Sequence, residues 1–271
     1  RTRRLIMRSY KLPGNRLRLL HPNENRGAVT IDEERDYHFR YVLEDNFGNR
    51  RTYQFIVKGK RQDIPEYKPE TNEMLYWNRT NVIQKPGMEL VVPRYYVYED
   101  VPLRTDMRGD SSHIAFDYIL DAGRTPIHSY CDLSIGLRHM PVADTTKYYI
   151  VQKAGKWRSS MGGKYANGWI KTRVRSLGTF SVDVDTIAPQ ITPIGQGGWR
   201  TSRNIRFRIK DMESGIGSYK VYIDGKFVLF GLKKGILVIQ DPEKVKKGVS
   251  HKLEVTVTDQ CGNMTRKEYK F

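Results

Sequence analysis

Apolar residues in this 271-residue chain recur with a period of two and almost never with the period of a helix. No run of twelve residues places them at i, i+3, i+4 and i+7. Short runs rich in β-branched and aromatic residues occur instead, separated by turn signals such as Asp224-Gly225. The predicted strands are Tyr37–Leu43, Tyr53–Val57, Glu89–Val92, Tyr95–Tyr98, Phe116–Leu120, Tyr148–Val151, Ile205–Ile209, Lys220–Ile223, Phe227–Phe230 and Leu253–Thr258. The sequence therefore predicts an all-β fold of tandem immunoglobulin-like or β-sandwich domains.

Two linkers divide the chain. The segment Lys60–Glu70 carries two prolines among charged residues, and Asp185-Thr186-Ile187-Ala188-Pro189 precedes a new strand. We predict a partial sandwich module at 1–60, a central β-sandwich domain at 70–184 and an immunoglobulin-like domain at 188–271. The first module has too few strands for a whole sandwich, so we expect upstream sequence to complete it. A start at Arg1 rather than methionine indicates a piece processed from a longer chain.

An internal repeat links the two ends of the chain. A strand beginning near His38 leads into Asp45-Asn46-Phe47-Gly48-Asn49 and a return strand, and a strand beginning near His251 leads into Asp259-Gln260-Cys261-Gly262-Asn263. The aspartate can accept hydrogen bonds from turn amides, and Gly-Asn suits left-handed backbone. The repeat predicts two related closing hairpins, with His38 and His251 at equivalent positions.

The net charge of +17 raises the possibility of nucleic-acid binding. Residues 1–60 hold 14 basic against 7 acidic residues, residues 61–187 hold 17 against 15, and residues 188–271 hold 16 against 8. Within these segments Lys171, Arg173 and Arg175 alternate with other residues, as do Arg206, Arg208 and Lys210. This alternation predicts that the basic residues form the solvent-exposed face of a half-buried sheet. No nucleic-acid motif is present, so a solvated face is favoured over a nucleic-acid groove.

The residues that could carry catalysis or bind a metal form no known constellation. His113…Asp117 and His128…Asp132 match H-x-x-x-D, but on a strand such positions lie about 13 Å apart, too far for one metal. No H-x-H follows. Cys131 and Cys261 fall in different predicted domains and are expected to be free thiols. Asp183, Asp185 and the segment 100–110 offer calcium ligands without EF-hand spacing. We therefore predict no catalytic residue and no metal or cofactor in this chain.

Tyrosines provide the one candidate binding surface. Tyr95, Tyr96 and Tyr98 lie on a single predicted strand, which places Tyr96 and Tyr98 on one face. Exposed rings of this kind can stack on sugars. The alternative, which the sequence favours, is that they pack in a core or between domains.

Several motifs in order resemble a known protein family. They are Lys147–Val151, Met161–Trp169, Leu177–Phe180, Asp185–Pro193, Asp211–Tyr219, Ile223–Lys226 and Asp259–Asn263. Together they resemble the C-terminal β-sandwich region that follows the catalytic domain in lysostaphin/LytM-type zinc metalloendopeptidases of Gram-negative envelope bacteria. The resemblance implies a parent enzyme that cuts peptidoglycan with a zinc-activated water. The glycine-rich H-x-x-x-D and the H-x-H of that family are missing, so no catalytic residue carries over, and zinc is implied only for an absent catalytic domain.

The resemblance implies a non-catalytic region that positions or regulates the peptidase. Its implied partners are an upstream peptidase domain, peptidoglycan or another envelope protein, in the periplasm or at the outer cell surface. Nucleic acid is not an expected partner, and no apolar run is long enough to span a membrane. A carbohydrate-binding or adhesion module that uses Tyr96 and Tyr98 is the alternative. An enzyme with a metal site assembled from loops is a third hypothesis.

Overall fold

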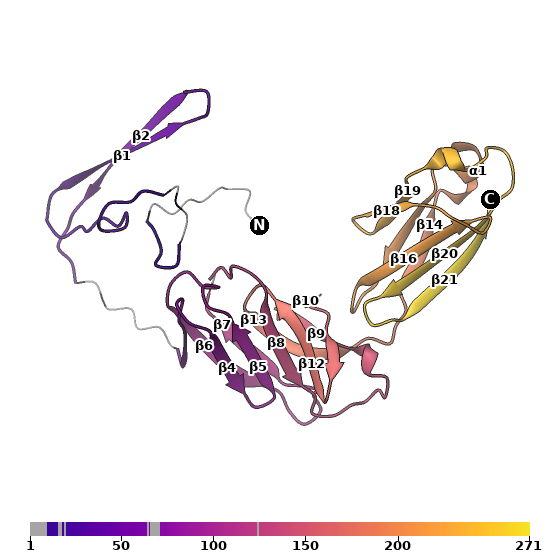
Figure 1. Ribbon diagram of the computed structural model, residues 1–271, viewed down its shortest axis with the longest axis horizontal. Coiled ribbons are helices and arrows are strands. Elements are labelled where there is room, and N and C mark those ends of the chain that lie inside the picture. The colour runs from indigo at the N-terminus through magenta and orange to yellow at the C-terminus, as the bar shows by residue number, and fades with distance from the viewer. Residues whose placement is uncertain (1–9, 16–17, 19, 64, 66–70, 124) are drawn as a thin grey trace. The chain divides into compact units, whose positions relative to one another are not determined.

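The structure, a computed structural model, describes residues 10–15, 18, 20–63, 65, 71–123 and 125–271. The chain divides into two compact units, Arg1–Glu70 and Thr71–Phe271. Residues 64 and 66–70 of the predicted linker Lys60–Glu70 lie outside the described part. Every sheet is antiparallel, and the helices in the described part are short (Figure 1). The all-β prediction is confirmed.

The first unit contains a two-stranded hairpin of β1 (Asp36–Glu44) and β2 (Arg50–Lys58). One of its faces is aromatic. The rings of Phe39 and Phe55 stack with centroids 5.1 Å apart, and Tyr41 pairs across the strands with Tyr53. Both tyrosines are exposed. A two-stranded sheet is at best marginally stable by itself. An exposed aromatic face on such a hairpin is therefore consistent with a partial module that needs further strands to cover it.

The central sandwich comprises two sheets whose strands belong to residues 73–184. One sheet has the order β10-β9-β13-β7-β6-β3, with β3 (Glu73–Leu75), β6 (Val101–Arg108), β7 (Asp117–Asp121), β9 (Tyr148–Ala154), β10 (Trp157–Ser160) and β13 (Gly178–Val184). The other has the order β11-β12-β8-β5-β4, with β4 (Asn81–Lys85), β5 (Met88–Val92), β8 (Cys131–Gly136), β11 (Lys164–Ala166) and β12 (Trp169–Val174).

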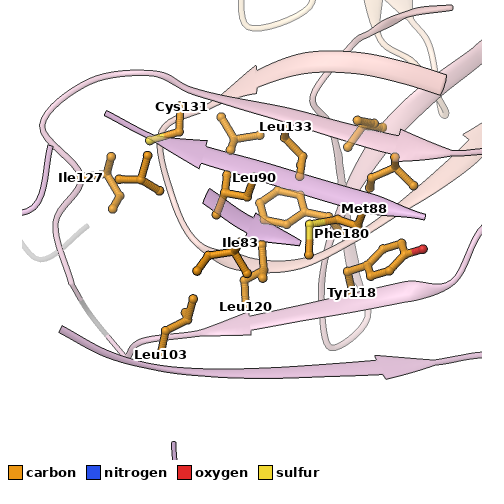
Figure 2. Close-up of a cluster of buried hydrophobic side chains, with 14 of the residues drawn as sticks. Ile83, Met88, Leu90, Leu103, Tyr118, Leu120, Ile127, Cys131, Leu133 and Phe180 are labelled. Atoms are coloured by element: carbon orange, nitrogen blue, oxygen red, sulfur yellow. The ribbon is translucent and has the colours of Figure 1, made fainter. Parts of the chain in front are cut away.

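Period-two alternation produces the core between these sheets. In β8, Cys131, Leu133 and Ile135 are buried, while the residues between them face outward. Figure 2 shows Leu133 with Leu90, Phe180 and Leu120 pointing into the space between the layers. Burying a large apolar side chain contributes about 1.5–3 kcal/mol, so this core is the main source of stability of the central sandwich.

The C-terminal sandwich is built from two four-stranded sheets in the described part of residues 190–270. One has the order β14-β15-β19-β18, with β14 (Gln190–Ile194), β15 (Arg206–Lys210), β18 (Phe230–Lys233) and β19 (Ile236–Ile239). The other has the order β17-β16-β20-β21, with β16 (Ile216–Ile223), β17 (Lys226–Phe227), β20 (Lys252–Asp259) and β21 (Met264–Lys270). The predicted single strand Phe227–Phe230 is divided, because the chain passes from one sheet to the other between β17 and β18.

Two local predictions in this domain are confirmed. Asp224 and Gly225 both have positive φ, +49° and +75°, and they join β16 to β17 as a two-residue turn. On β15, Arg206, Arg208 and Lys210 are exposed while Phe207 and Ile209 are buried. The basic residues therefore form a solvated face, as the alternation predicts.

The internal repeat is confirmed by matching hydrogen bonds. Asp45 accepts from the N–H groups of Phe47 and Asn49 and from Asn49 Nδ2. Asp259 accepts the same three bonds, from Cys261 N, Asn263 N and Asn263 Nδ2.

The cross-strand pairing of the two hairpins also matches, with Phe39 opposite Phe55 and Leu253 opposite Tyr269. Counted from the shared aspartate, His251 corresponds to Tyr37. The predicted equivalence of His38 and His251 is therefore wrong by one residue, because the two hairpins pair with the same spacing and no inserted residue.

His251 is a buried hydrogen-bonding residue in the C-terminal sandwich. Its Nδ1 lies 2.6 Å from Asp224 Oδ2, and its Nε2 lies 2.8 Å from the carbonyl oxygen of Lys246. Burial of the ring lowers its pKa, but the bonds to Asp224 and Lys246 outweigh burial and raise the pKa above the ordinary 6.5.

The raised pKa of His251 predicts a pH dependence of stability. The stabilisation is fully present below pH 6.5 and is lost as the pH rises through the raised pKa, because only the folded state then still holds the proton. Urea unfolding at several pH values should show this decline, and His251→Gln should remove it. His139→Gln, at an exposed histidine, is the matched control. An identical pH profile for wild type and His251→Gln would refute the assignment.

Candidate functional site

The predicted sugar-stacking tyrosines, Tyr96 and Tyr98, do not lie on a strand. Residues 94–99 form turns and bends between β5 and β6. Tyr95 has φ +70°, which breaks the alternation that would place two rings on one face. The predicted strand Tyr95–Tyr98 is therefore wrong.

Both tyrosines contact His128 instead. The carbonyl oxygen of Tyr96 accepts a hydrogen bond from His128 N at 2.8 Å, and its ring packs against the central core. The hydroxyl of Tyr98 lies 2.7 Å from His128 Nδ1. The two tyrosines are thus fixed by contacts with His128 and the core, and they do not form a flat exposed surface for a sugar. Sugar binding at Tyr96 and Tyr98 stays a prediction that this geometry does not favour.

In the two H-x-x-x-D pairs the histidines precede the strands instead of lying on them, with His113 before β7 and His128 before β8. His113 Nδ1 lies 2.9 Å from Asp110 Oδ1, while Asp117 pairs with Lys153 Nζ at 2.6 Å. His128 contacts Tyr98, and Asp132 lies on the outer face of β8. Among the described residues, neither histidine forms a hydrogen bond or an ion pair with the aspartate four positions later.

The two cysteines are free and buried, as predicted. Burial raises the pKa of both the Cys131 and the Cys261 thiol to about 11. A thiol with such a pKa carries little thiolate at neutral pH, so neither is suited to nucleophilic attack.

Three aspartates from separate parts of the chain meet where the central sandwich leads into the C-terminal one. Asp185 follows β13, Asp211 follows β15, and Asp259 ends β20. One carboxylate oxygen from each lies within 4.8 Å of the other two, and both Asp185 and Asp259 are buried. This group is called the aspartate junction below.

Backbone amides and one side-chain amide hold the carboxylates of the aspartate junction. Asp185 accepts from Ile187 N at 2.9 Å and from Ser214 N at 3.0 Å. Asp211 accepts from Gly215 N at 2.6 Å and from Glu213 N at 3.1 Å. The amide Nδ2 of Asn263 donates to Asp259 Oδ2 at 2.8 Å and to the carbonyl oxygen of Asp185 at 3.0 Å. One asparagine thus connects the closing hairpin to the linker.

Further contacts surround the aspartate junction. Cys261 packs with Tyr149 and Val151 of β9 in a small buried cluster. Lys147 Nζ donates to the carbonyl oxygen of Cys261 at 3.0 Å, and the Tyr149 hydroxyl donates to Glu213 Oε2 at 3.3 Å. Burial, reinforced by nearby carboxylates, raises the pKa of Tyr149 and keeps it neutral as a donor. Side chains of β9 therefore contact loops of the C-terminal sandwich directly.

Close backbone approach also positions Asp259. At Gly217, a Cβ atom would lie 2.5 Å from the carbonyl oxygen of Asp259. Only glycine fits at such a distance. Gly217 lies at the irregularity between Ile216 and Ser218 where β16 pairs with β20, so glycine here lets the two strands meet beside the aspartate junction.

Electrostatics sets what the aspartate junction can do chemically. Burial first, and then the charges of Asp185 and Asp259, raise the pKa of Asp211, although its amide bonds act in the other direction. Three carboxylate oxygens at this spacing could hold a hard divalent cation. Each carboxylate already accepts two or more hydrogen bonds from amide groups, so the arrangement also works as a structural connection without an ion.

The sequence shows part of this site. Asp185 is among the candidate oxygen ligands, and the Asp-x-x-Gly-Asn turn marks Asp259 and Asn263 as turn residues. Asp211 has no signal beyond its place before Ser214-Gly215. The meeting of the three residues depends on the docking of two domains, which no local pattern reports.

The comparisons with known proteins concern the central sandwich. The family model described as the Zu5-like domain matches residues 72–185. No curated protein matches the chain. No helix in the described part is long and apolar enough to cross a membrane. The match begins beside β3 and ends at Asp185, so the central sandwich is similar to a Zu5-like domain.

Proposed function

We propose that this chain is a non-catalytic positioning region of a larger cell-envelope protein related to the zinc endopeptidases that cut peptidoglycan. In this proposal the two sandwiches of residues 71–271 act as one spacer, which holds a neighbouring peptidase domain relative to the cell wall or to an envelope protein. The order of motifs along the chain supports the relationship to that family.

The aspartate junction is the observation that carries the proposal. A flexible linker between independent domains exposes its backbone and carries few contacts. Here the buried side chain of Asp185 accepts hydrogen bonds from Ile187 N in the linker and from Ser214 N of the C-terminal sandwich. The backbone N–H of Asp185 donates to the carbonyl oxygen of Lys147 in the central sandwich at 2.9 Å. Such contacts favour a fixed connection, and a fixed connection is what a spacer needs.

Measurements on the whole chain test both parts of the proposal. By ¹⁵N relaxation, the two sandwiches should tumble with one correlation time, because the aspartate junction couples them. Different correlation times for the two sandwiches would contradict the spacer role. Purified peptidoglycan incubated with the chain and added zinc should release no fragments. Reproducible cleavage would contradict the non-catalytic part and favour an enzyme with a loop-assembled site.

A further inference from the structure

The outer face of one sheet of the central sandwich is hollowed. The hollow has a volume of about 590 Å³ and lies over β5, β8, β12 and β11. Its lining includes Glu89, Asp132, Lys164, Lys171 and Arg173. It belongs to a different part of the unit from the aspartate junction and does not depend on the proposed spacer role.

Strand order separates the charges in this hollow. Lys164 of β11 pairs directly with Lys171 of β12, and Arg173 of β12 pairs with Asp132 of β8. The cations thus gather over β11 and β12, whereas Glu89 lies on β5, two strands from β12. One half of the hollow is basic and the other half is acidic.

Lys164 and Lys171 have no anion opposite them in the strand pairing, whereas Arg173 lies opposite Asp132. No ion pair within the described part of the chain includes Lys164, Lys171 or Arg173, although Arg173 lies 5.9 Å above the ring of Tyr130. Two lysines placed directly opposite each other on neighbouring strands repel and reduce stability. An anion bound between them would remove that repulsion.

The chemistry of the lining favours a peptide over a polysaccharide or a nucleic acid. None of the ten residues that line the hollow is aromatic, and the Tyr130 ring beside Arg173 lies outside that lining, so the hollow itself offers no ring for stacking on a sugar or a base. Glu89 and Asp132 would repel a uniformly anionic polymer. A peptide can place carboxylates over the basic half and its own amides over the acidic half.

We propose that this hollow binds an extended peptide segment rich in aspartate and glutamate. Strands lie about 4.8 Å apart, so the path from Lys164 on β11 to Glu89 on β5 is about 14 Å. An extended chain rises about 3.3 Å per residue, so four or five residues cover that path. The segment would set its carboxylates against Lys164, Lys171 and Arg173.

Fluorescence anisotropy with the whole chain tests the proposal. The probes are a labelled alternating Glu-Ser peptide, the matching Lys-Ser peptide and an oligogalacturonate, each at low and at physiological ionic strength. The Glu-Ser peptide should bind and the Lys-Ser peptide should not. Affinity should fall as salt rises, because exposed charges are screened.

Variants locate the binding. The triple change Lys164→Gln, Lys171→Gln and Arg173→Gln should weaken Glu-Ser binding by roughly tenfold, since each exposed charge contributes modestly. The matched control changes the same number of exposed cations on β15, Arg206→Gln, Arg208→Gln and Lys210→Gln, and should change affinity less than about twofold. The single change Lys171→Glu provides a second test if the triple variant folds poorly.

Three results would overturn the proposal. The first is an equal loss of Glu-Ser affinity in the hollow variant and in the β15 control. The second is no binding of the Glu-Ser peptide. The third is binding of oligogalacturonate that is tighter than that of the Glu-Ser peptide and depends on the same three cations. The first would indicate attraction by net charge alone. The last would assign the surface to an anionic polysaccharide.

Discussion

Replacement of Trp199 by alanine should lower the free energy of unfolding of the C-terminal sandwich by about 3–5 kcal/mol. Trp199 begins the short helix α1 (Trp199–Ser202) and is completely buried. Its ring contacts Phe207, Tyr269 and Phe271 with centroid separations of 5.1, 5.9 and 5.8 Å. Its Nε1 donates to the carbonyl oxygen of Ile194 at 3.0 Å. Alanine leaves a cavity and an unsatisfied carbonyl.

Urea unfolding followed by circular dichroism measures this loss. Trp157→Ala is the matched control, because the Trp157 side chain is 81% exposed and its removal should cost little. A loss below about 1 kcal/mol for Trp199→Ala would mean that the aromatic cluster repacks around the gap and does not stabilise the domain as described.

The second large effect is expected at the aspartate junction. Asp185→Ala removes the acceptor of Ile187 N and Ser214 N, and Ser214 is fully buried. An unsatisfied buried donor costs about 1–3 kcal/mol, so the variant should lose about 2–4 kcal/mol. The loss should also weaken the coupling of the sandwiches, because the side chain that directly follows β13 then no longer holds Ser214 of the C-terminal sandwich.

Asp183→Ala is the control for this variant. Asp183 lies two residues earlier and forms an ion pair with the exposed Arg158, a contact expected to contribute less than about 1 kcal/mol. Calorimetry of the two variants should show a second, lower-temperature transition only for Asp185→Ala. Equal stability of the two variants would show that the buried carboxylate does not hold the domains together.

Some of the strands, such as β15 and β20, could be predicted from the sequence because their signal is local. Alternation on β15 and β20 sets the buried and exposed faces, and Asp224-Gly225 determines a turn by its own backbone preference. The repeat could be found because both hairpins use one aspartate to hold the same three N–H groups.

The features that the sequence predicted wrongly or did not reveal have physical causes. Tyr95–Tyr98 has the composition of a strand, but Tyr95 N donates to the carbonyl oxygen of Trp77, and the positive φ of Tyr95 turns the chain. That bond joins residues 18 positions apart, so alternation within the segment does not report it. The aspartate junction likewise needs three separate parts of the chain from two domains. The opposed lysines Lys164 and Lys171 become neighbours only through the pairing of β11 with β12.

The Asp-x-x-Gly-Asn turn has a consequence for the order of folding. Its bonds join residues no more than four apart, and β20 and β21 follow each other directly in the chain. Local hairpins close in about 1–10 μs, faster than pairings between distant segments. We therefore expect the β20–β21 hairpin to form early, with the Asp259 carboxylate already held by its amides. The contacts with Asp185, 74 positions away in the chain, then form last, when a finished C-terminal sandwich docks on the central one.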